Sequence, residues 1–242
     1  MRRLIRLSVF VISAWFFQSP MTAQAQLRYD VDASGGLIPY DYTGNPAHPG
    51  IYAELIPMLM GRAGVEIESV VLPTKRAVKA LEEGLLDFDF VNPDWFDDSK
   101  SLQGYVFSVP IFEFTESFYR LADKPSTISS LDDLAGRSVG TVAGYMYVNE
   151  EYFQRIDFAS EKLLVKGLSM GRFDVAIIER AAAQFWSKEL GIPLYRITDN
   201  NAGHMVLRLR AEHIKLLPSI NQAIQSAKSD GSIERLMSSY TL

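Results

Sequence analysis

Two segments of this chain repeat one pattern of residues 87 positions apart. Val78–Asp87 and Val165–Asp174 share Val, Lys, Leu, Gly and Asp in one register, and each runs into an apolar stretch that ends at Asn92 or Glu179. In each copy, a glycine suited to the left-handed end of a helix precedes a run with apolar residues on both faces. Such a run is typical of a buried strand in a parallel sheet. The repeat therefore predicts two similar α/β halves; coincidence is the alternative, because helix–glycine–strand units are common in α/β proteins.

The polar residues that end these two strands are the first candidates for a binding site. Ligands of open parallel sheets bind outside the carboxyl ends of the strands. We therefore expect Asn92 and Glu179 to face a cleft shared by the two halves. The repeated acids Asp87 and Asp174 are interpreted as turn and strand-start residues with a structural role.

The first 25 residues have the pattern of a secretory signal peptide. Three arginines precede the apolar stretch Leu7–Phe17, and residues 23–25 (Ala-Gln-Ala) form a small-x-small cleavage site. The apolar stretch is too short to span a bilayer comfortably, although a membrane anchor is the alternative. We expect a mature chain that begins at Gln26.

Composition excludes several classes of function. The chain has no cysteine, which rules out disulfides, thiol catalysis and cysteine metal sites. Its net charge of −5 becomes more negative once the arginine-rich N-terminal segment is removed, so nucleic acid and anionic lipid are poor partners. No later stretch is apolar enough to insert in a membrane. We expect a soluble monomer in an oxidising compartment, the bacterial periplasm.

Hydrophobic periodicity predicts strands that alternate with helices along the mature chain. Among the expected elements are the helices Tyr145–Arg155 and Ala211–Ser229. The alternating segment Phe112–Leu121 and the polar break Asp199–Gly203 are predicted to cross between the halves. One lobe would then contain residues 26–112 and 204–242, with residues 113–203 inserted as the second lobe. Two lobes joined by two crossings can close on a ligand like a hinge.

Several short motifs, in this order and spacing, resemble the periplasmic solute-binding proteins of family 3, which serve amino-acid ABC importers. The motifs are Ile38-Pro39-Tyr40 before Gly50, Arg76 through Asp87, Phe107-Ser108-x-Pro110, Asp133–Gly140 with Gly144, Leu168–Asp174, and Asp230-Gly231. The resemblance covers essentially the whole mature chain. It implies an α/β, two-lobed type II periplasmic-binding-protein fold with a ligand cleft between the lobes. The implied function is capture of a small polar solute, an amino acid or a related amine or organic molecule, for a separate membrane permease, with no cofactor and no reaction.

The resemblance also implies roles for single residues. Tyr40 would stack on the ligand, and Asn92 with Trp95 would line the same wall. For Trp95, lobe packing is an equal alternative, because an exposed loop tryptophan is costly. Glu179 would hold an ammonium group of the ligand or form a structural ion pair.

A carboxylate of the ligand would bind elsewhere in the implied cleft. Gly144, Tyr145 and Met146 would offer backbone N–H groups at a helix N-terminus, which is a natural anion site. Arg76 is an added ligand candidate, because a cation near a helix start opposes the helix dipole. The loop Asn92–Tyr105 lacks the arginine that usually binds the α-carboxylate in this family, so a cationic or aromatic-compatible ligand is the alternative to a standard amino acid.

No metal site and no catalytic group are expected. The histidines lack metal-ligand spacing, and the G-x-S-x-G match at residues 167–171 has its predicted helix and strand in the reverse of the hydrolase order. Two rival functions stay open. One is a dehydratase-like enzyme on this scaffold, which would need a cleft carboxylate with a raised pKa, such as Glu179. The other is a sensory or accessory subunit that binds a separate receptor.

Overall fold

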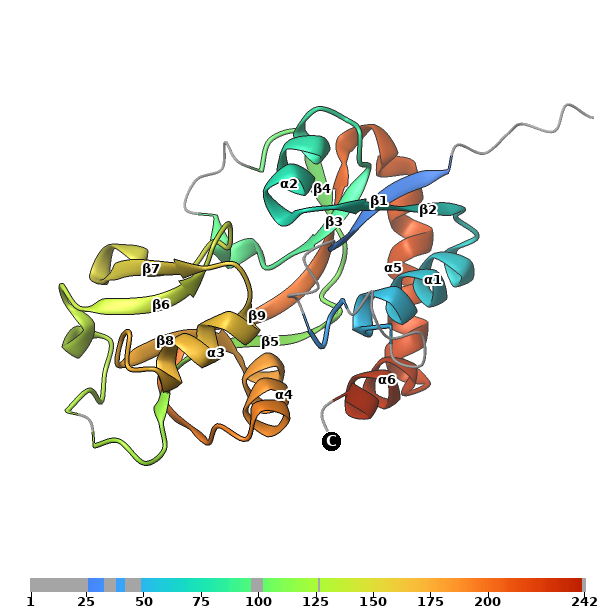
Figure 1. The fold of residues 1–242 in the computed structure, drawn as a ribbon. Coiled ribbons are helices and arrows are strands. Elements are labelled where there is room, and N and C mark those ends of the chain that lie inside the picture. Colours follow the sequence, from blue (N-terminus) through green and yellow to red (C-terminus); the bar gives the residue numbers. More distant parts are fainter. Residues whose placement is uncertain (1–25, 33–37, 42–48, 97–101, 126, 241–242) are drawn as a thin grey trace, which may run out of the picture.

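Two long antiparallel strands, β5 (Phe112–Leu121) and β9 (Leu194–Arg210), run through both lobes of the molecule in the computed structural model (Figure 1). The structure describes residues 26–32, 38–41, 49–96, 102–125 and 127–240; the predicted signal peptide lies outside these residues. β5 and β9 pair from Phe112 opposite Met205 to Leu121 opposite Leu194. Their register shifts between Glu116 and Ser117 and between Phe118 and Tyr119, which marks irregular pairing where the lobes meet.

Lobe 1 is built on the outer half of β9, at the right of Figure 1. β3 (Phe88–Val91) and β4 (Tyr105–Phe107) pair antiparallel with this half of β9, and β1 (Leu27–Asp32) pairs parallel with β2 (Ile67–Leu72). The helices of this lobe are α1 (Ile51–Ala63), α2 (Thr74–Glu82), α5 (Leu217–Ser229) and α6 (Ser232–Tyr240). α1 buries Ile51, Leu55 and Leu59, which lie on one face at helical spacing, against the lobe core.

Lobe 2 has its own sheet and its own hydrophobic core. β6 (Ser138–Val142) lies between β7 (Gln154–Phe158) and β8 (Val175–Glu179), parallel to both, and β8 pairs antiparallel with β5. The helices are α3 (Glu161–Ser169) and α4 (Arg180–Leu190), with α4 next to β8 in sequence. Gly140 of β6 allows the close approach of Phe173, because a Cβ there would meet its ring at 2.2 Å.

The architecture is the two-lobed α/β arrangement that the sequence predicted. Separate clusters of buried side chains fill lobe 1 and lobe 2. The predicted boundaries, 26–112 with 204–242 and 113–203, stay a prediction. No helix among the described residues is long and apolar enough to cross a membrane.

Three expectations about the elements are wrong. The predicted helix Tyr145–Arg155 is a turn, a 3-10 segment (η3, Glu150–Tyr152) and the start of β7, because β6 needs a parallel neighbour at its outer edge. The predicted break Asp199–Gly203 lies inside β9, where the Asp199 carboxylate accepts a hydrogen bond from Ser117 of β5 at 2.6 Å.

The third wrong expectation concerns strand direction. β3 was expected in a parallel ladder, but its ladder partner is the antiparallel strand β9. As a result, β3 and β8 belong to one connected sheet of seven strands, joined only through β9 and β5. The helical segment expected over Ala211–Ser229 is present, as the 3-10 segment η4 (Ala211–Leu216) followed by α5.

Candidate ligand-binding cleft

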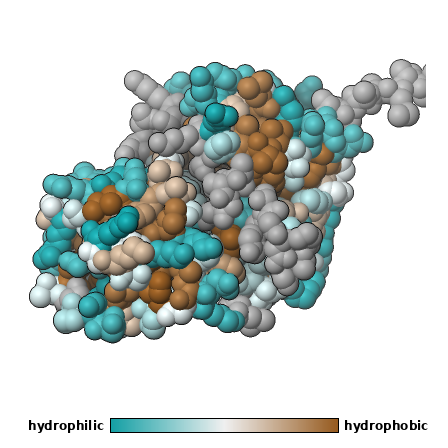
Figure 2. All heavy atoms as spheres, in the orientation of Figure 1, coloured by the Kyte–Doolittle hydropathy of each residue, from teal (hydrophilic) through white to brown (hydrophobic). Residues whose placement is uncertain are grey.

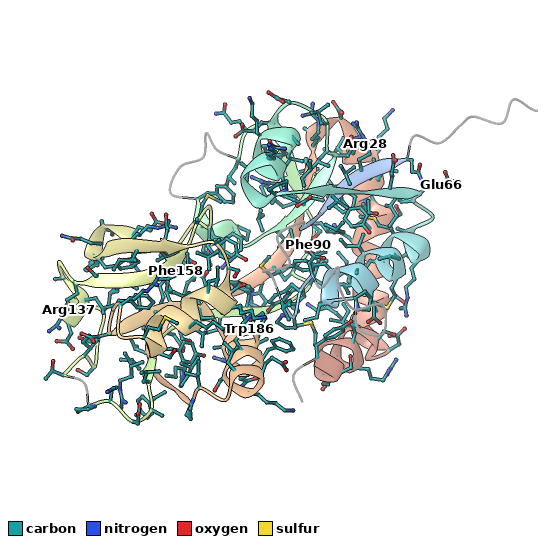
Figure 3. All side chains as sticks on the ribbon, viewed as in Figure 1. Arg28, Glu66, Phe90, Arg137, Phe158 and Trp186 are labelled. Carbon is teal, nitrogen blue, oxygen red and sulfur yellow. The ribbon has the colours of Figure 1, made fainter. Side chains whose placement is uncertain are left out.

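A cavity of about 200 Å³ lies between the lobes, and its wall comes from both of them. Lobe 1 contributes residues of β1, α1, α2 and β3, the crossing strands contribute residues of β5 and β9, and lobe 2 contributes the turn after β6. The aromatic side chains of the wall are Tyr29, Tyr40, Tyr52, Phe88, Phe90, Trp95, Phe114 and Tyr145. Phe90 lies in the middle of the molecule in Figure 3, whereas Trp186 lies within lobe 2.

The aromatic wall is a packed assembly with fixed ring geometry. Tyr52 stacks on Phe90 at 4.4 Å between ring centroids and contacts Tyr40 at 5.2 Å. Trp95 meets Phe114 edge-on at 5.4 Å. Rings held in this way keep their faces in place without cost on binding, and such faces attract cations.

Asn92 supports the wall from behind and does not line the cavity. Its side chain accepts a hydrogen bond from the Asp94 backbone N–H at 3.1 Å, which caps the 3-10 turn η1 (Pro93–Trp95). Asn92 is fully buried against Gly203 of β9. It therefore fixes the turn that carries Trp95 into the cavity wall.

Gly144, Tyr145 and Met146 do line the cavity, but in a turn and not at a helix start. Gly144 has a φ of 92°, and the Tyr145 N–H donates to the Val142 carbonyl at 3.2 Å. The Tyr145 hydroxyl donates to Glu161 of α3 at 3.1 Å. The helix N-terminus that was to hold a ligand carboxylate is therefore absent at this place.

Glu179 lies behind Tyr40, in a second cavity of about 20 Å³. Its carboxylate accepts a hydrogen bond from the Ala182 N–H at 2.9 Å, which caps α4, and one from the Tyr40 hydroxyl. Burial raises the pKa of Glu179, and these hydrogen bonds oppose the rise. Two neighbours within the protein thus already engage this carboxylate.

Arg76 is not brought to the cleft. Its exposed side chain lies on α2 beside a separate hollow that Leu72 and Leu85 also line. Figure 2 shows apolar side chains gathered over this part of lobe 1, around β2 and α2. The predicted contact of Arg76 with the ligand therefore has no support in the geometry.

Sequence reasoning missed the charged residues of the cavity wall. Arg208 of β9 donates two hydrogen bonds to Asp89 of β3, at 2.9 and 2.5 Å, and its guanidinium lies 4.8 Å from the Tyr105 ring centroid. A charged residue inside the apolar run Met205–Leu209 is the signal that a buried partner exists. Among the described residues, Arg208 is the only cation that lines the cavity.

Glu116 of β5 is the second missed residue. It lines both cavities, and its side chain is buried, with the residue 3% exposed. Burial raises the pKa of Glu116 to about 8, a rise that the nearby indole N–H of Trp95 opposes. Neither Oε2 of Glu116 nor Nε1 of Trp95 has a hydrogen-bond partner among the described residues.

The one group of described residues with the composition of a metal site lies outside the cleft. Asp87, Glu212 and His213 bring ligand atoms within 4.8 Å of one another. Asp87, however, accepts hydrogen bonds from the backbone and the guanidinium of Arg28, at 2.7 and 3.1 Å. This guanidinium already supplies the positive charge, and we assign no metal here.

The chain has clear relatives. The family model of bacterial extracellular solute-binding proteins, family 3, matches residues 29–242. The probable amino-acid-binding protein YxeM of Bacillus subtilis (strain 168) is 22% identical over 220 residues, which are 87% of this chain and 82% of the relative.

Solved structures show the same fold. The amino acid ABC transporter substrate-binding protein AbpA of Streptococcus pneumoniae, bound to L-arginine, superposes with a TM-score of 0.72 at 18% identity, over 88% of this chain and 94% of its own. The ancestral amino acid-binding protein AncCDT-1, a precursor of cyclohexadienyl dehydratase, gives a TM-score of 0.71 at 18% identity, over 90% and 96%.

Proposed function

Because the chain belongs to family 3 of the bacterial extracellular solute-binding proteins, we propose that it captures a small cationic solute in the cleft between its lobes. The charge of the cavity wall carries this proposal. Besides the buried carboxyl of Glu116, which holds its proton near neutral pH, three carboxylates line the cavity, from Asp30, Asp41 and Asp89, against one guanidinium. That guanidinium, of Arg208, is engaged by Asp89. A positive group would therefore be stabilised, and an anionic group would meet net repulsion.

The aromatic wall supports the same class of solute. Faces of Tyr and Trp rings stabilise a desolvated cation by about 2 kcal/mol. Tyr40, Tyr52 and Trp95 are among the aromatic residues that line the cavity. Cationic amino acids and amines such as polyamines have this chemistry, and the relative AbpA was solved with L-arginine bound.

Capture would work by closure of the lobes about β5 and β9, which are the only described strands that run through both lobes. In this proposal the chain is exported to the periplasm through its N-terminal signal peptide. The closed form then delivers the solute to a separate permease of the ABC type. A separate receptor in place of the permease would make the protein a sensory subunit, and co-purification with membrane proteins separates these two roles.

Thermal unfolding of the mature chain with a panel of solutes tests the proposal. L-arginine and putrescine supply positive charge, L-citrulline is the neutral isostere of L-arginine, and L-glutamate is the acidic control. A solute at 100 times its Kd stabilises by about 2.7 kcal/mol, which raises the melting temperature measurably. We expect stabilisation by the cations alone. Stabilisation by L-glutamate or L-citrulline without any by L-arginine or putrescine would contradict the proposal.

A second candidate is an enzyme of the dehydratase type, favoured by one observation. Both Glu116 and Glu179 are buried carboxyls at the cleft with raised pKa values, and such groups can transfer protons. Proton NMR of a bound solute decides between capture and turnover. An unchanged spectrum supports capture, whereas new resonances that appear in proportion to protein concentration establish an enzyme.

A further inference from the structure

Glu116 holds a special position at the junction of the two lobes. It lies on β5 immediately before the first register shift, opposite Asn201 of β9 and Glu179 of β8. Its side chain lines both the main cavity and the small cavity behind Tyr40. One carboxylate oxygen, Oε2, is buried and has no hydrogen-bond partner among the described residues. A buried oxygen without a hydrogen bond destabilises the folded protein. A ligand that donates a hydrogen bond to this oxygen therefore binds more tightly.

Neighbouring carboxylates of the cleft already have partners inside the protein. Asp89 binds Arg208 through two hydrogen bonds. Glu179 caps α4 and accepts from Tyr40. Asp30 accepts from the Leu72 N–H at 2.9 Å. A solute would have to compete with these contacts, whereas Oε2 of Glu116 accepts no hydrogen bond among the described residues, and the indole N–H of Trp95 is the donor that lies near this carboxyl.

We infer that Glu116 is the carboxylate that pairs with the positively charged group of the solute. This inference rests on the proposed function and makes it specific, because it places the counter-charge on the strand that joins the lobes. A charge received there contacts lobe 1, lobe 2 and their connection together. Binding at Glu116 would therefore favour the closed arrangement of the lobes.

The surroundings of Glu116 hold acids and phenols. Glu179 of β8 and Glu150 of η3 act on it electrostatically, and both raise its pKa. Tyr40, Tyr145, Tyr147 and Glu161 line the small cavity with it, and Trp95 faces it from η1. The nearby cation Arg155 of β7 is held in ion pairs with Glu150 and Asp157.

Proton release on binding follows from this environment. With a pKa of about 8, Glu116 holds a proton near neutral pH in the empty cleft. A bound cation favours the ionised carboxylate, so the proton leaves as the solute enters. The affinity for a cation should then rise with pH up to about 8 and level off above it.

Isothermal titration calorimetry with L-arginine tests the inference, because its guanidinium stays charged throughout the range used. Titration of the mature chain at about pH 7, in two buffers with different ionisation enthalpies, counts the protons released. We expect close to one proton per solute for the wild type. Glu116→Gln should abolish this release and weaken binding at least tenfold. Glu113→Gln is the matched control, because Glu113 is exposed on the same strand and does not line the cavity.

Each outcome of this titration supports or overturns the role of Glu116 or the proposed function. Wild-type binding that Glu116→Gln leaves unchanged in affinity and proton count overturns the inference and leaves the proposed function intact. Failure of the wild type to bind L-arginine and putrescine overturns the proposed function, and the inference with it. If Glu116→Gln does not fold, the wild-type count decides, since binding without proton release at about pH 7 excludes a protonated Glu116 as the receiving group.

Discussion

Glu116 should make the stability of the empty protein depend on pH. Its pKa is about 8 in the folded chain against an ordinary value of 4.5, so the folded state binds more protons than the unfolded state between these values. The free energy of unfolding therefore falls as pH rises through this window, by roughly 1 kcal/mol per pH unit from this group. In Glu116→Gln this slope should be lost.

Thermal melts at several pH values between the two pKa values measure this effect. The wild type and Glu113→Gln should lose melting temperature with rising pH more steeply than Glu116→Gln. Parallel curves for all three proteins would show that Glu116 is ionised in the empty cleft.

Trp95 should report the arrival of the solute. The sequence has three tryptophans, of which one lies in the predicted signal peptide, and Trp186 is buried in the core of lobe 2. We expect a cationic solute to change the tryptophan emission of the wild type and of Trp186→Phe. The change should vanish in Trp95→Phe, and Trp95→Ala should weaken binding by about tenfold. An emission change that persists in Trp95→Phe and vanishes in Trp186→Phe would place the solute away from the aromatic wall.

Single residues differ in how far the sequence reveals them. Tyr40, Trp95 and the residues 144–146 were named from the family resemblance; they line the cavity, and their contact with a solute stays a prediction. Glu116 was missed because the register shifts in β5 break the alternation that tells which side chains point inward. Arg208 and Asp89 come together only through the pairing of β3 with β9, which no local pattern of either strand specifies.

At the scale of elements, the contact of β9 with η1 links the crossing strand to the cavity wall. A Cβ on Gly203 would lie 2.6 Å from Nδ2 of Asn92 and 2.8 Å from a carboxylate oxygen of Asp94. Gly203→Ala should therefore displace η1, destabilise the fold by about 1–3 kcal/mol and weaken solute binding. Denaturant unfolding and titration of the same samples measure both effects.

Gly61→Ala is the control for this substitution. Gly61 lies within α1, where an added Cβ meets nothing within 4 Å. The substitution should stabilise by about 0.5–1 kcal/mol, since alanine favours helix more than glycine. Equal stability of Gly203→Ala and the wild type would mean that η1 can move away from the added Cβ without loss of stability. Asn92 and η1 would then not hold Trp95 in a fixed position.

Elements with strong periodicity were predictable, and elements set by tertiary pairing were not. β5 has the bounds that the alternating segment Phe112–Leu121 predicted, because its side chains follow one period for most of its length. Residues 145–155 contain acids and aromatics that are compatible with a helix. Residues 154–158 nevertheless form a strand, because they pair with the edge of β6. The polar residues 199–203 looked like a loop because they carry no apolar alternation, although their backbone pairs with β5 inside β9.

At the scale of the whole molecule, the repeat that predicted two halves describes architecture more than function. Both copies form a helix followed by a strand, α2 with β3 and α3 with β8. The repeated acids have diverged: Asp87 is buried and bound by Arg28 and His213, whereas Asp174 is exposed. The lobes could be predicted because each encloses its own core, but the cavity between them depends on their relative placement, which the chain does not specify locally.

Hydrogen exchange of the mature chain with and without saturating L-arginine tests most directly whether the solute is held between the lobes. We expect slower exchange at amides of both lobes together. The protected amides should lie in residues 88–96, which contain β3 and η1, and in residues 142–147, at the end of β6 and in the turn that follows. Protection confined to one lobe, with the solute bound, would contradict capture in the cleft.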